Sequence, residues 1–276
     1  MNRLFVALKP AGVSSNYFLR SLKRKYKIKK AGYSGTLDPF ADGCLIVAFG
    51  QYSKLFRFFK KVPKRYKATL FLGAQSETLD TEKIYNIINI EPISKDVVQN
   101  VLHSLIGDLR YLPPKYSAKK INGKKAYELA RQNKEFELKE IKSIIYDVKL
   151  LSYTHPYINF DISVSEGSYI RSIGAIIAEK LGTTGVLKTL TRVNEGLFVY
   201  DNEKSLNPVK FLRTEENLYL LDKLDILLGK KLKAESFKKS ENGEYHLIID
   251  NFLSIIKIEN NEVTYLLNRV VLEDLC

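Results

Sequence analysis

The segment 32–43, with the sequence GYSGTLDPFADG, places the carboxylate of Asp38 in a tight turn between two strongly basic stretches. Gly32 and Gly35 permit backbone angles that other residues avoid, and Pro39 fixes φ and removes a hydrogen-bond donor. We therefore expect Asp38 to be clamped in place. A carboxylate held rigidly among cations is either a structural ion-pair partner, as in an ordinary Asp-Pro turn, or a reactive group that faces an anionic substrate.

The charge of the chain points to a polyanionic partner. Its formal net charge is +13 and its isoelectric point is near 9.4. Seven of the eleven residues 20–30 and seven of the fourteen residues 54–67 are lysine or arginine, with no acidic residue in either stretch. A third basic group follows a Pro-Pro pair and consists of Lys115, Lys119, Lys120, Lys124 and Lys125.

Aromatic residues lie among these basic groups: Tyr17, Tyr26, Tyr33, Tyr66 and Tyr116. Phosphates bind cations and unstacked bases stack on aromatic rings, so the combination favours a groove for RNA or DNA. The alternative is that each basic run is simply a solvated helix face.

The composition argues against several other classes of protein. Hydrophobic residues make up 45% of the chain and charged residues 27%, which is typical of a globular protein. The sequence has no run of about 18 apolar residues, and residues 1–9 are too short for a signal peptide, so we expect a cytoplasmic protein without a membrane segment. Cys44 and Cys276 have no framework spacing, and the three histidines are scattered, so we expect no disulfide and no metal site.

The hydrophobic pattern predicts strands and helices without regular βαβ alternation. Strands are expected at 3–8, 44–49, 65–72, 144–151 and 158–164. Helices are expected from Ser14 or Ser15 to residue 26 and at 52–60, 94–105, 169–181 and 219–228. This order favours an α+β fold with a mixed, mostly antiparallel central sheet flanked by helices.

Two regions are expected to stand apart from that sheet. Residues 112–131 begin with a Pro-Pro pair and contain Asn122-Gly123, which predicts a projecting hairpin-and-helix arm within about 111–135. A change of composition at 202–208 marks a candidate linker. We therefore predict one large domain at 1–205 and a C-terminal region at 206–276, made of a helix and a small β-rich module.

Four segments together resemble one family, tRNA pseudouridine synthase B (the TruB family), in order and spacing over about residues 3–200. They are KPAGVSS at 9–15, the segment 32–43, PPKYSA at 113–118 with AYELAR at 126–131, and GSYIR at 167–171 with LTR at 190–192. The resemblance implies the pseudouridine synthase fold and an isomerase that works without a metal or an organic cofactor. Such an enzyme cuts the N-glycosidic bond of the T-loop uridine of tRNA and rejoins the sugar to C5 of the same uracil.

The resemblance also implies roles for individual residues. Asp38 matches the catalytic aspartate, which attacks either the uracil ring or the anomeric carbon of the ribose. Arg171 matches the arginine that pairs with this aspartate and keeps it ionised in a partly dry pocket. Tyr66 matches the tyrosine that stacks on the target base, and its phenol is a candidate for moving a proton.

Further substrate-binding positions follow from the same resemblance. Tyr169 and Leu190 match residues that line the base pocket, Asp80 matches a second acid near the substrate, and Lys9 lies in the first of the four segments. Tyr33 stands where the family usually has the histidine that helps to hold the flipped T-loop, and a tyrosine there can still stack on a base.

Other departures from the family concern the arm and the C-terminus. The position before Leu-Pro-Pro, often glutamine in the family, is Tyr111, and Lys115 follows the Pro-Pro pair in place of an apolar residue. The C-terminal region is shorter than the usual RNA-binding PUA domain, and segments 252–257 and 268–270 are candidates for its remnant.

These observations favour a stand-alone, monomeric tRNA pseudouridine synthase that needs no protein partner. One alternative is a tRNA-binding or RNA-folding protein with an idle pocket, and another is a guide-RNA-dependent synthase of the dyskerin type with partner proteins. A uridine C5-methyltransferase fits less well, because Cys44 lies in an apolar strand with no cation beside it and the sequence has no Gly-x-Gly-x-x-Gly loop.

Overall fold

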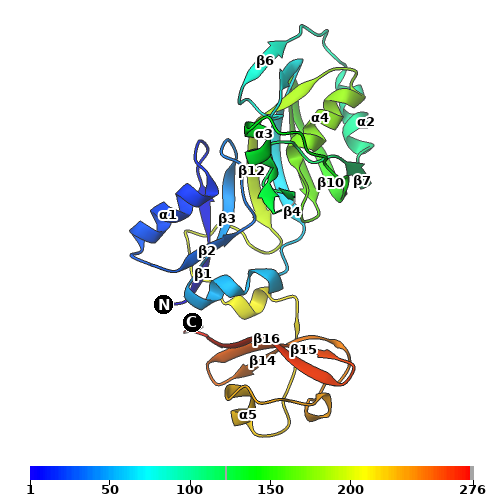
Figure 1. Ribbon diagram of the computed structural model, residues 1–276. Coiled ribbons are helices and arrows are strands. Elements are labelled where there is room, and N and C mark those ends of the chain that lie inside the picture. Colours follow the sequence, from blue (N-terminus) through cyan, green and yellow to red (C-terminus); the bar gives the residue numbers. More distant parts are fainter. Residues whose placement is uncertain (122, 274–276) are drawn as a thin grey trace.

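The structure, a computed structural model, describes residues 1–121 and 123–273. Its central feature is an eight-stranded sheet with the order β1-β3-β12-β4-β11-β10-β7, in which β2 pairs with β3 (Figure 1). All of these strand pairs are antiparallel except β3 with β12. The strands are β1 Arg3–Lys9, β2 Ala31–Ser34, β3 Asp42–Phe49, β4 Lys64–Leu72, β7 Gly107–Tyr111, β10 Ile141–Thr154, β11 Tyr157–Val164 and β12 Gly185–Glu195. The expected mixed, mostly antiparallel α+β sheet is confirmed.

The sheet is covered on both faces where β1 and β3 lie, which explains why β3 is buried almost throughout. The side chains on one face of these strands, such as Phe5 and Val47, pack against helix α1 (Ser15–Lys25). The side chains on the opposite face, such as Val6 and Ile46, pack with aromatic residues of the segment 50–59 and with the C-terminal module. Farther along the sheet, a third core is formed with α2 (Lys95–His103) and α4 (Ile170–Lys180).

Three of the expected helices are confirmed. Ser14 caps α1, where its Oγ accepts a hydrogen bond of 3.2 Å from the backbone N of Tyr17. Ser94 caps α2 in the same way through the backbone N of Val97. The third, α4, begins directly after Tyr169.

Two expected helices are wrong in type or extent. Residues 52–60 form two short 3₁₀ turns, η1 (Gly50–Lys54) and η2 (Phe56–Phe58), in place of one α-helix. Their most deeply buried side chains, Tyr52, Leu55 and Phe58, recur every third residue, and this period matches the three residues per turn of a 3₁₀ helix.

The helix expected at 219–228 is restricted to α5 (Lys223–Leu227). Asp222 caps it by accepting a hydrogen bond of 2.9 Å from the backbone N of Leu224, so the helix cannot begin earlier. Tyr219 instead forms an isolated β-bridge with Phe237.

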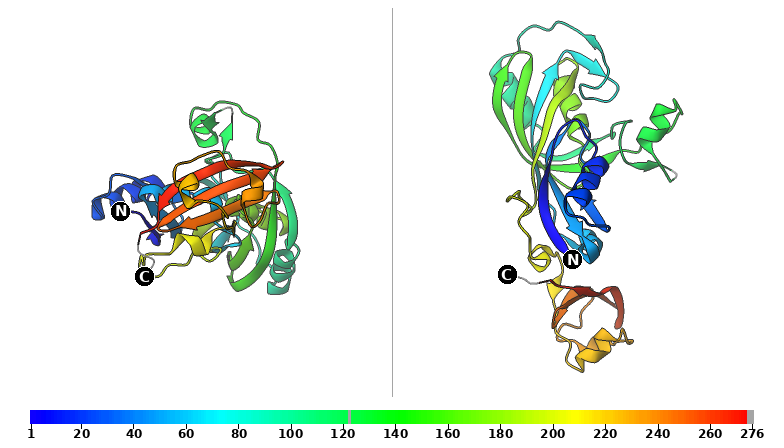
Figure 2. Two further views of the ribbon diagram at one scale, coloured as in Figure 1. Left: turned by 90° about the horizontal axis from the view of Figure 1, so that it is seen from below. Right: turned by 90° about the vertical axis from the view of Figure 1, so that its left-hand side faces the viewer.

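The arm at 112–131 contains the expected short hairpin and helix. Strands β8 (Lys120–Ile121) and β9 (Lys124–Lys125) pair antiparallel, and α3 (Ala126–Arg131) follows. Figure 2 shows this region projecting from the body of the molecule in its right-hand view. Asn122, which belongs to the expected Asn-Gly turn, lies outside the described residues.

The C-terminal region forms a four-stranded sheet with the order β13-β14-β15-β16, at the opposite end of the molecule from α2 (Figure 1). Its strands are β13 Glu215–Glu216, β14 Gly243–Ile249, β15 Phe252–Glu259 and β16 Glu262–Val271. Leu253 and Val270 of this sheet share a buried cluster with Phe58 of η2, so the module packs on the larger body. The remaining elements are β5 Ala74–Ser76, β6 Ile84–Ile87, η3 Pro208–Phe211 and η4 Ala234–Ser236.

Across the described residues, the helices are all too short or too polar to cross a membrane.

Candidate active site

The loop between β2 and β3 carries Asp38, and the segment at 9–15 holds this loop from one side. The Oγ of Ser15 donates a hydrogen bond of 2.9 Å to the carbonyl oxygen of Leu37 and accepts one of the same length from the backbone N of Leu37. The backbone N of Gly12 donates to the carbonyl oxygen of Pro39 at 2.8 Å. The residues on either side of Asp38 are therefore both tied to this segment.

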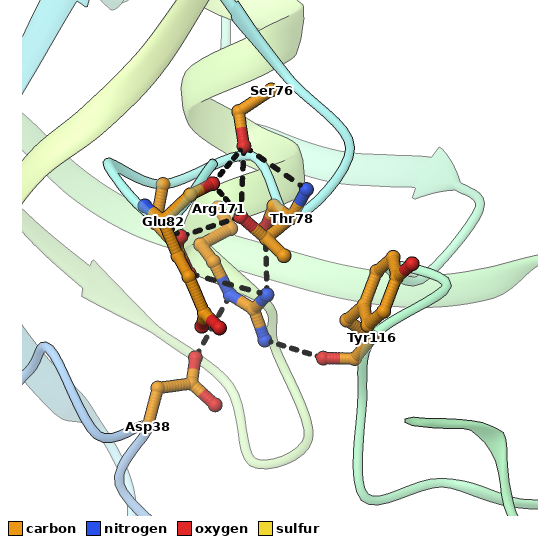
Figure 3. Close-up of polar contacts among 7 residues, drawn as sticks. Asp38, Ser76, Thr78, Glu82, Tyr116 and Arg171 are labelled. Carbon is orange, nitrogen blue, oxygen red and sulfur yellow. Dashed lines mark hydrogen bonds and ion pairs between the residues drawn. The ribbon is translucent and has the colours of Figure 1, made fainter. Parts of the chain in front are cut away.

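Arg171, in the first turn of α4, contacts Asp38 directly. Its Nε lies 2.8 Å from Asp38 Oδ2 (Figure 3). Its other nitrogens are also engaged, because Nη1 donates to the carbonyl oxygen of Thr78 at 2.7 Å and Nη2 to that of Tyr116 at 2.9 Å. The Arg171 side chain is only 4% exposed, whereas that of Asp38 is 34% exposed. The guanidinium is thus fixed from three directions, and the carboxylate that it holds is open to solvent on its other side.

Asp80 lies behind Arg171. Its Oδ2 is 3.6 Å from Arg171 Nη1, and its Oδ1 accepts hydrogen bonds from Thr78 Oγ1 at 2.6 Å and from the backbone N of Glu82 at 2.9 Å. Ser76 supports the same turn, because its Oγ donates to the carbonyl oxygen of Glu82 at 2.6 Å (Figure 3). One buried guanidinium is therefore shared between two carboxylates.

The electrostatics of the site follow from this arrangement. Burial raises the pKa of Asp38 above its ordinary value of 3.8, and the nearby carboxylate of Asp80 raises it further. The Arg171 guanidinium acts in the opposite direction by favouring the ionised carboxylate, as does Lys9 more weakly.

Lys9 is placed differently from the other candidate residues. It is 1% exposed, and its Nζ donates to the backbone carbonyl oxygens of Pro10 at 2.8 Å and Val13 at 2.7 Å, with that of Pro39 at 3.5 Å. Burial lowers the pKa of Lys9 from 10.5 to about 8. The structure thus places Lys9 beneath the loop of Asp38, where its contacts are with backbone carbonyls.

Two adjoining cavities open at Asp38 and Arg171. The first has a volume of about 280 Å³ and is also lined by the sequence-predicted residues Tyr66, Tyr169 and Leu190. The second has a volume of about 460 Å³ and is also lined by the sequence-predicted residues Tyr33 and Asp80. The structure therefore brings together every candidate site residue except Lys9 around one pair of cavities.

Neighbouring contacts explain how some of these side chains are held. Tyr33 donates a hydrogen bond of 3.2 Å from its hydroxyl to Asn16 Oδ1, at the start of α1. The hydroxyl of Tyr111 accepts a hydrogen bond of 2.9 Å from the backbone N of Tyr169. Tyr111, which differs from the usual residue of the family, thus supports the backbone of a residue that lines the first cavity.

The sequence interpretation did not find several residues of the site. Thr78 and Tyr116 hold Arg171 through backbone carbonyls, and such contacts leave no trace in residue type. Lys64 and Arg192 line the first cavity, and the completely buried Glu195 lies between them. The positive residues carried a signal, because Lys64 belongs to a basic run and Arg192 to the motif LTR, but Glu195 had none.

A model of the family described as TruB family pseudouridylate synthase (N terminal domain) matches residues 23–170. Proteins named tRNA pseudouridine synthase B are similar over 98% of this chain and of their own length, at 52% identity in Sulfurovum sp. (strain NBC37-1) and 49% in a Nitratiruptor species. This chain belongs to the TruB family of pseudouridylate synthases. The resemblance inferred from the sequence motifs is therefore confirmed.

Solved structures give the same fold. A chain in the structure of an H/ACA RNP bound to a substrate RNA containing 2'-deoxyuridine superposes with a TM-score of 0.67 at 16% identity, over 99% of this chain and 85% of that chain. A chain of a Cbf5-Nop10-Gar1 complex has the same TM-score at 17% identity, over 98% of this chain and 84% of that chain. The expected pseudouridine synthase fold is confirmed.

Proposed function

We propose that this TruB-family chain is a stand-alone tRNA pseudouridine synthase that converts the T-loop uridine to pseudouridine, with Asp38 as its nucleophile. The observation that carries this proposal is the Asp38 carboxylate, which is 2.8 Å from the buried Arg171 guanidinium and borders a cavity walled by Tyr66, Tyr169 and Leu190. A nucleophilic carboxylate needs a cation to stay ionised in such a site, and a planar base needs flat and apolar walls.

The reaction exchanges one bond to the sugar for another. Ionised Asp38 attacks either the uracil ring or the anomeric carbon, and the bond from C1′ to N1 breaks. C1′ then joins C5, and the bond to Asp38 breaks, which frees the carboxylate. The hydrogen on C5 leaves as a proton and N1 gains one, so atoms balance and no electron donor is required. Tyr66 lines the same cavity as Asp38, and its phenol is our candidate for moving this proton.

The target uridine must leave its stack before it reaches Asp38, at a cost of a few kcal/mol. Stacking on an aromatic ring contributes roughly 1–3 kcal/mol per base, so a tyrosine in the pocket can offset much of this cost. Tyr66 and Tyr169 border the first cavity, and Tyr33 borders the second. We assign Tyr66 to the flipped uracil and Tyr33 to a neighbouring base of the loop.

The basic surface next to the pocket supports an RNA substrate. Asn16, at the start of α1, lines the cavity of Asp38, and farther along the same helix a groove of about 630 Å³ runs beside its outer face. The groove is lined by Tyr17, Arg20, Lys23, Arg24, Ile28 and Lys29. Four cations and one tyrosine, 51% exposed, fit a phosphate backbone with a stacked base or ribose.

The remaining assignments follow from the same proposal. Residues 1–205 form the catalytic domain, the arm at about 111–135 contacts the T-arm, and 206–276 form a reduced PUA-like module. The protein acts in the cytoplasm as a monomer, without a metal, an organic cofactor or an obligatory protein partner. The relatives at about half identity over nearly the whole chain carry the name tRNA pseudouridine synthase B, which favours this reading over a guide-RNA-dependent synthase.

The decisive experiment incubates the purified protein with unmodified tRNA, without additives, and maps pseudouridine by chemical labelling. We expect one modified site, in the T-loop. The matched variant Asp38→Asn should lower turnover by more than about 10⁴-fold, because the amide cannot act as a nucleophile, while the tRNA Kd stays within a few fold. If this variant turned over as fast as the wild-type enzyme, the role of Asp38 as nucleophile would be refuted. A modified site outside the T-loop would refute the substrate assignment but not the reaction.

A further inference from the structure

A second arginine lies on the other side of the catalytic loop from Arg171. Arg192, on β12, is 1% exposed. Its Nε donates to the carbonyl oxygen of Cys44 and its Nη2 to that of Gly35, both at 2.8 Å. These two carbonyls stand on either side of the segment that carries Asp38. One guanidinium therefore joins the beginning and the end of the loop.

Arg192 is itself fixed by a buried chain of charges. Its Nη2 lies 3.0 Å from Glu195 Oε1, and Glu195 Oε2 lies 2.8 Å from the Nζ of Lys64. The side chains of Arg192 and Glu195 are 1% and 0% exposed, and that of Lys64 is 8% exposed. Charges removed from water are costly unless they are closely paired, so the three groups form one unit, and loss of Glu195 would leave two cations without their shared counter-charge.

The backbone of the loop fits closely against this unit. A Cβ on Gly35, where φ is +68°, would lie 3.0 Å from Glu195 Oε2 and 3.1 Å from Arg192 Nη1. At Gly43, which pairs with Arg192 between the parallel strands β3 and β12, a Cβ would overlap the carbonyl oxygen of Arg192. The loop thus touches the charged unit at Gly35 and Cys44 and the backbone of Arg192 at Gly43. Glycine is favoured at Gly35 by its positive φ and is required at Gly43 by the close approach of the Arg192 backbone.

We propose that Arg192, held by Glu195 and Lys64, is a positioning residue that sets the place of the Asp38 carboxylate by fixing both ends of its loop. This inference rests on the proposed function, because it assigns Asp38 as the nucleophile. The hydrogen bonds of Arg192 to the loop go to the backbone carbonyls of Cys44 and Gly35, so its hold on Asp38 passes through the backbone. A displacement of a reacting group by about 1 Å can cost about 100-fold in rate, so a small shift of the loop suffices for a large effect.

Three variants disturb this contact from different sides. Arg192→Ala removes both hydrogen bonds, Glu195→Gln keeps the shape of the buried unit but removes its negative charge, and Gly35→Ala pushes the loop away from an intact unit. Ile256→Ala serves as the control, because Ile256 is fully buried in the core of the C-terminal sheet, on β15, and its truncation costs stability without touching the loop or the cluster that contains Tyr66 and Leu190.

The experiment measures single-turnover rate, tRNA Kd, melting temperature and amide hydrogen exchange of residues 36–42. We expect rates lowered by about 100-fold in Arg192→Ala and by about 10-fold in Glu195→Gln and Gly35→Ala, with Kd within about 3-fold of the unmodified enzyme. Exchange in the loop should rise by about 10-fold in all three. In Ile256→Ala the melting temperature should fall while the rate and the loop exchange stay unchanged.

Two results would overturn the inference. In the first, Glu195→Gln and Gly35→Ala have lower melting temperatures but the single-turnover rate of the wild-type enzyme, which would make the charged unit purely structural. In the second, Kd rises in parallel with the loss of activity, which would make Arg192 an RNA contact. Failure of the proposed function looks different, because the unmodified enzyme would then form no pseudouridine in tRNA.

Discussion

Asp38 stands between two arginine networks, and the two differ in what they hold. Arg171 contacts the Asp38 carboxylate itself and shares its single positive charge between Asp38 and Asp80. Arg192 contacts the backbone of the loop, and its own charge is paired with the buried Glu195. We therefore expect the charge state of the proposed nucleophile and its location to be controlled separately, so variants of each network should differ in their kinetics.

The largest effect is expected when the ion pair between Arg171 and Asp38 is removed. Arg171→Met should lower the single-turnover rate by about 10³-fold, because the loss of one partner from a buried ion pair costs about 3–5 kcal/mol and each 1.36 kcal/mol is tenfold in rate. The tRNA Kd should stay within a few fold. The matched control is Arg65→Met, because Arg65 forms a comparable pair with Asp161, at 2.8 Å, but is half exposed. A rate loss in Arg65→Met as large as that in Arg171→Met would contradict the assignment.

The pH dependence separates the two networks more finely. Asp38 must be ionised, and burial raises its pKa above 3.8, so activity should fall as the pH is lowered through that raised value. Arg171 lowers this pKa, so Arg171→Gln should move the acid limb of the rate profile to higher pH.

Variants of the Arg192 network, which contacts the loop backbone, should lower the plateau of the rate–pH profile and leave its acid limb in place. Gly35→Ala is the cleanest example, because it changes no charge. Rate profiles from pH 4 to pH 8 would check this directly. If the acid limbs of Gly35→Ala and Arg171→Gln moved together, the two networks would not be separable.

The smallest effect is expected at the third support of the loop. Ser15→Ala removes two hydrogen bonds to Leu37, each contributing about 0.5–1.5 kcal/mol, but the contacts of Arg192 and Gly12 with the loop remain. The rate should therefore fall by only about 3-fold, with the acid limb unchanged. Ser14→Ala is the neighbouring control, because it removes only the cap of α1. Equal rate losses in the two variants would show that the integrity of α1, and not the bond to Leu37, is what matters.

The resemblance to the TruB family found the parts of the site that lie within the shared motifs. The turn of Asp38 and the arginine at 171 lie together as expected, since a carboxylate facing a dry pocket requires a fixed cation. Lys9 could not be placed in the same way, because the sequence does not reveal that its ammonium group points at backbone carbonyls. Glu195 was missed for a similar reason, as its importance comes from neighbours distant in the chain.

The fold was predicted best where hydrophobic periodicity is simple. Strand β4 alternates regularly and was found, whereas β12 was missed because two register shifts, between Leu187 and Thr189 and between Arg192 and Asn194, interrupt its pairing with β4. Strand β2 is only four residues long and follows a basic run, so it gave little signal. At 52–60 an α-helix was expected, but the buried side chains Tyr52, Leu55 and Phe58 recur every third residue and the chain forms two 3₁₀ turns.

The hydrogen bonds of Arg192 to the loop join residues that are 148 and 157 positions apart in the chain. During synthesis, the ribosome therefore releases the stretch bearing Asp38 long before the strand that completes its support. A nascent or prematurely terminated polypeptide already displays most of the lysines that attract nucleic acid, yet it lacks an assembled reaction centre. We therefore expect a polypeptide truncated before Arg192 to carry Asp38 without the support that holds both ends of its loop.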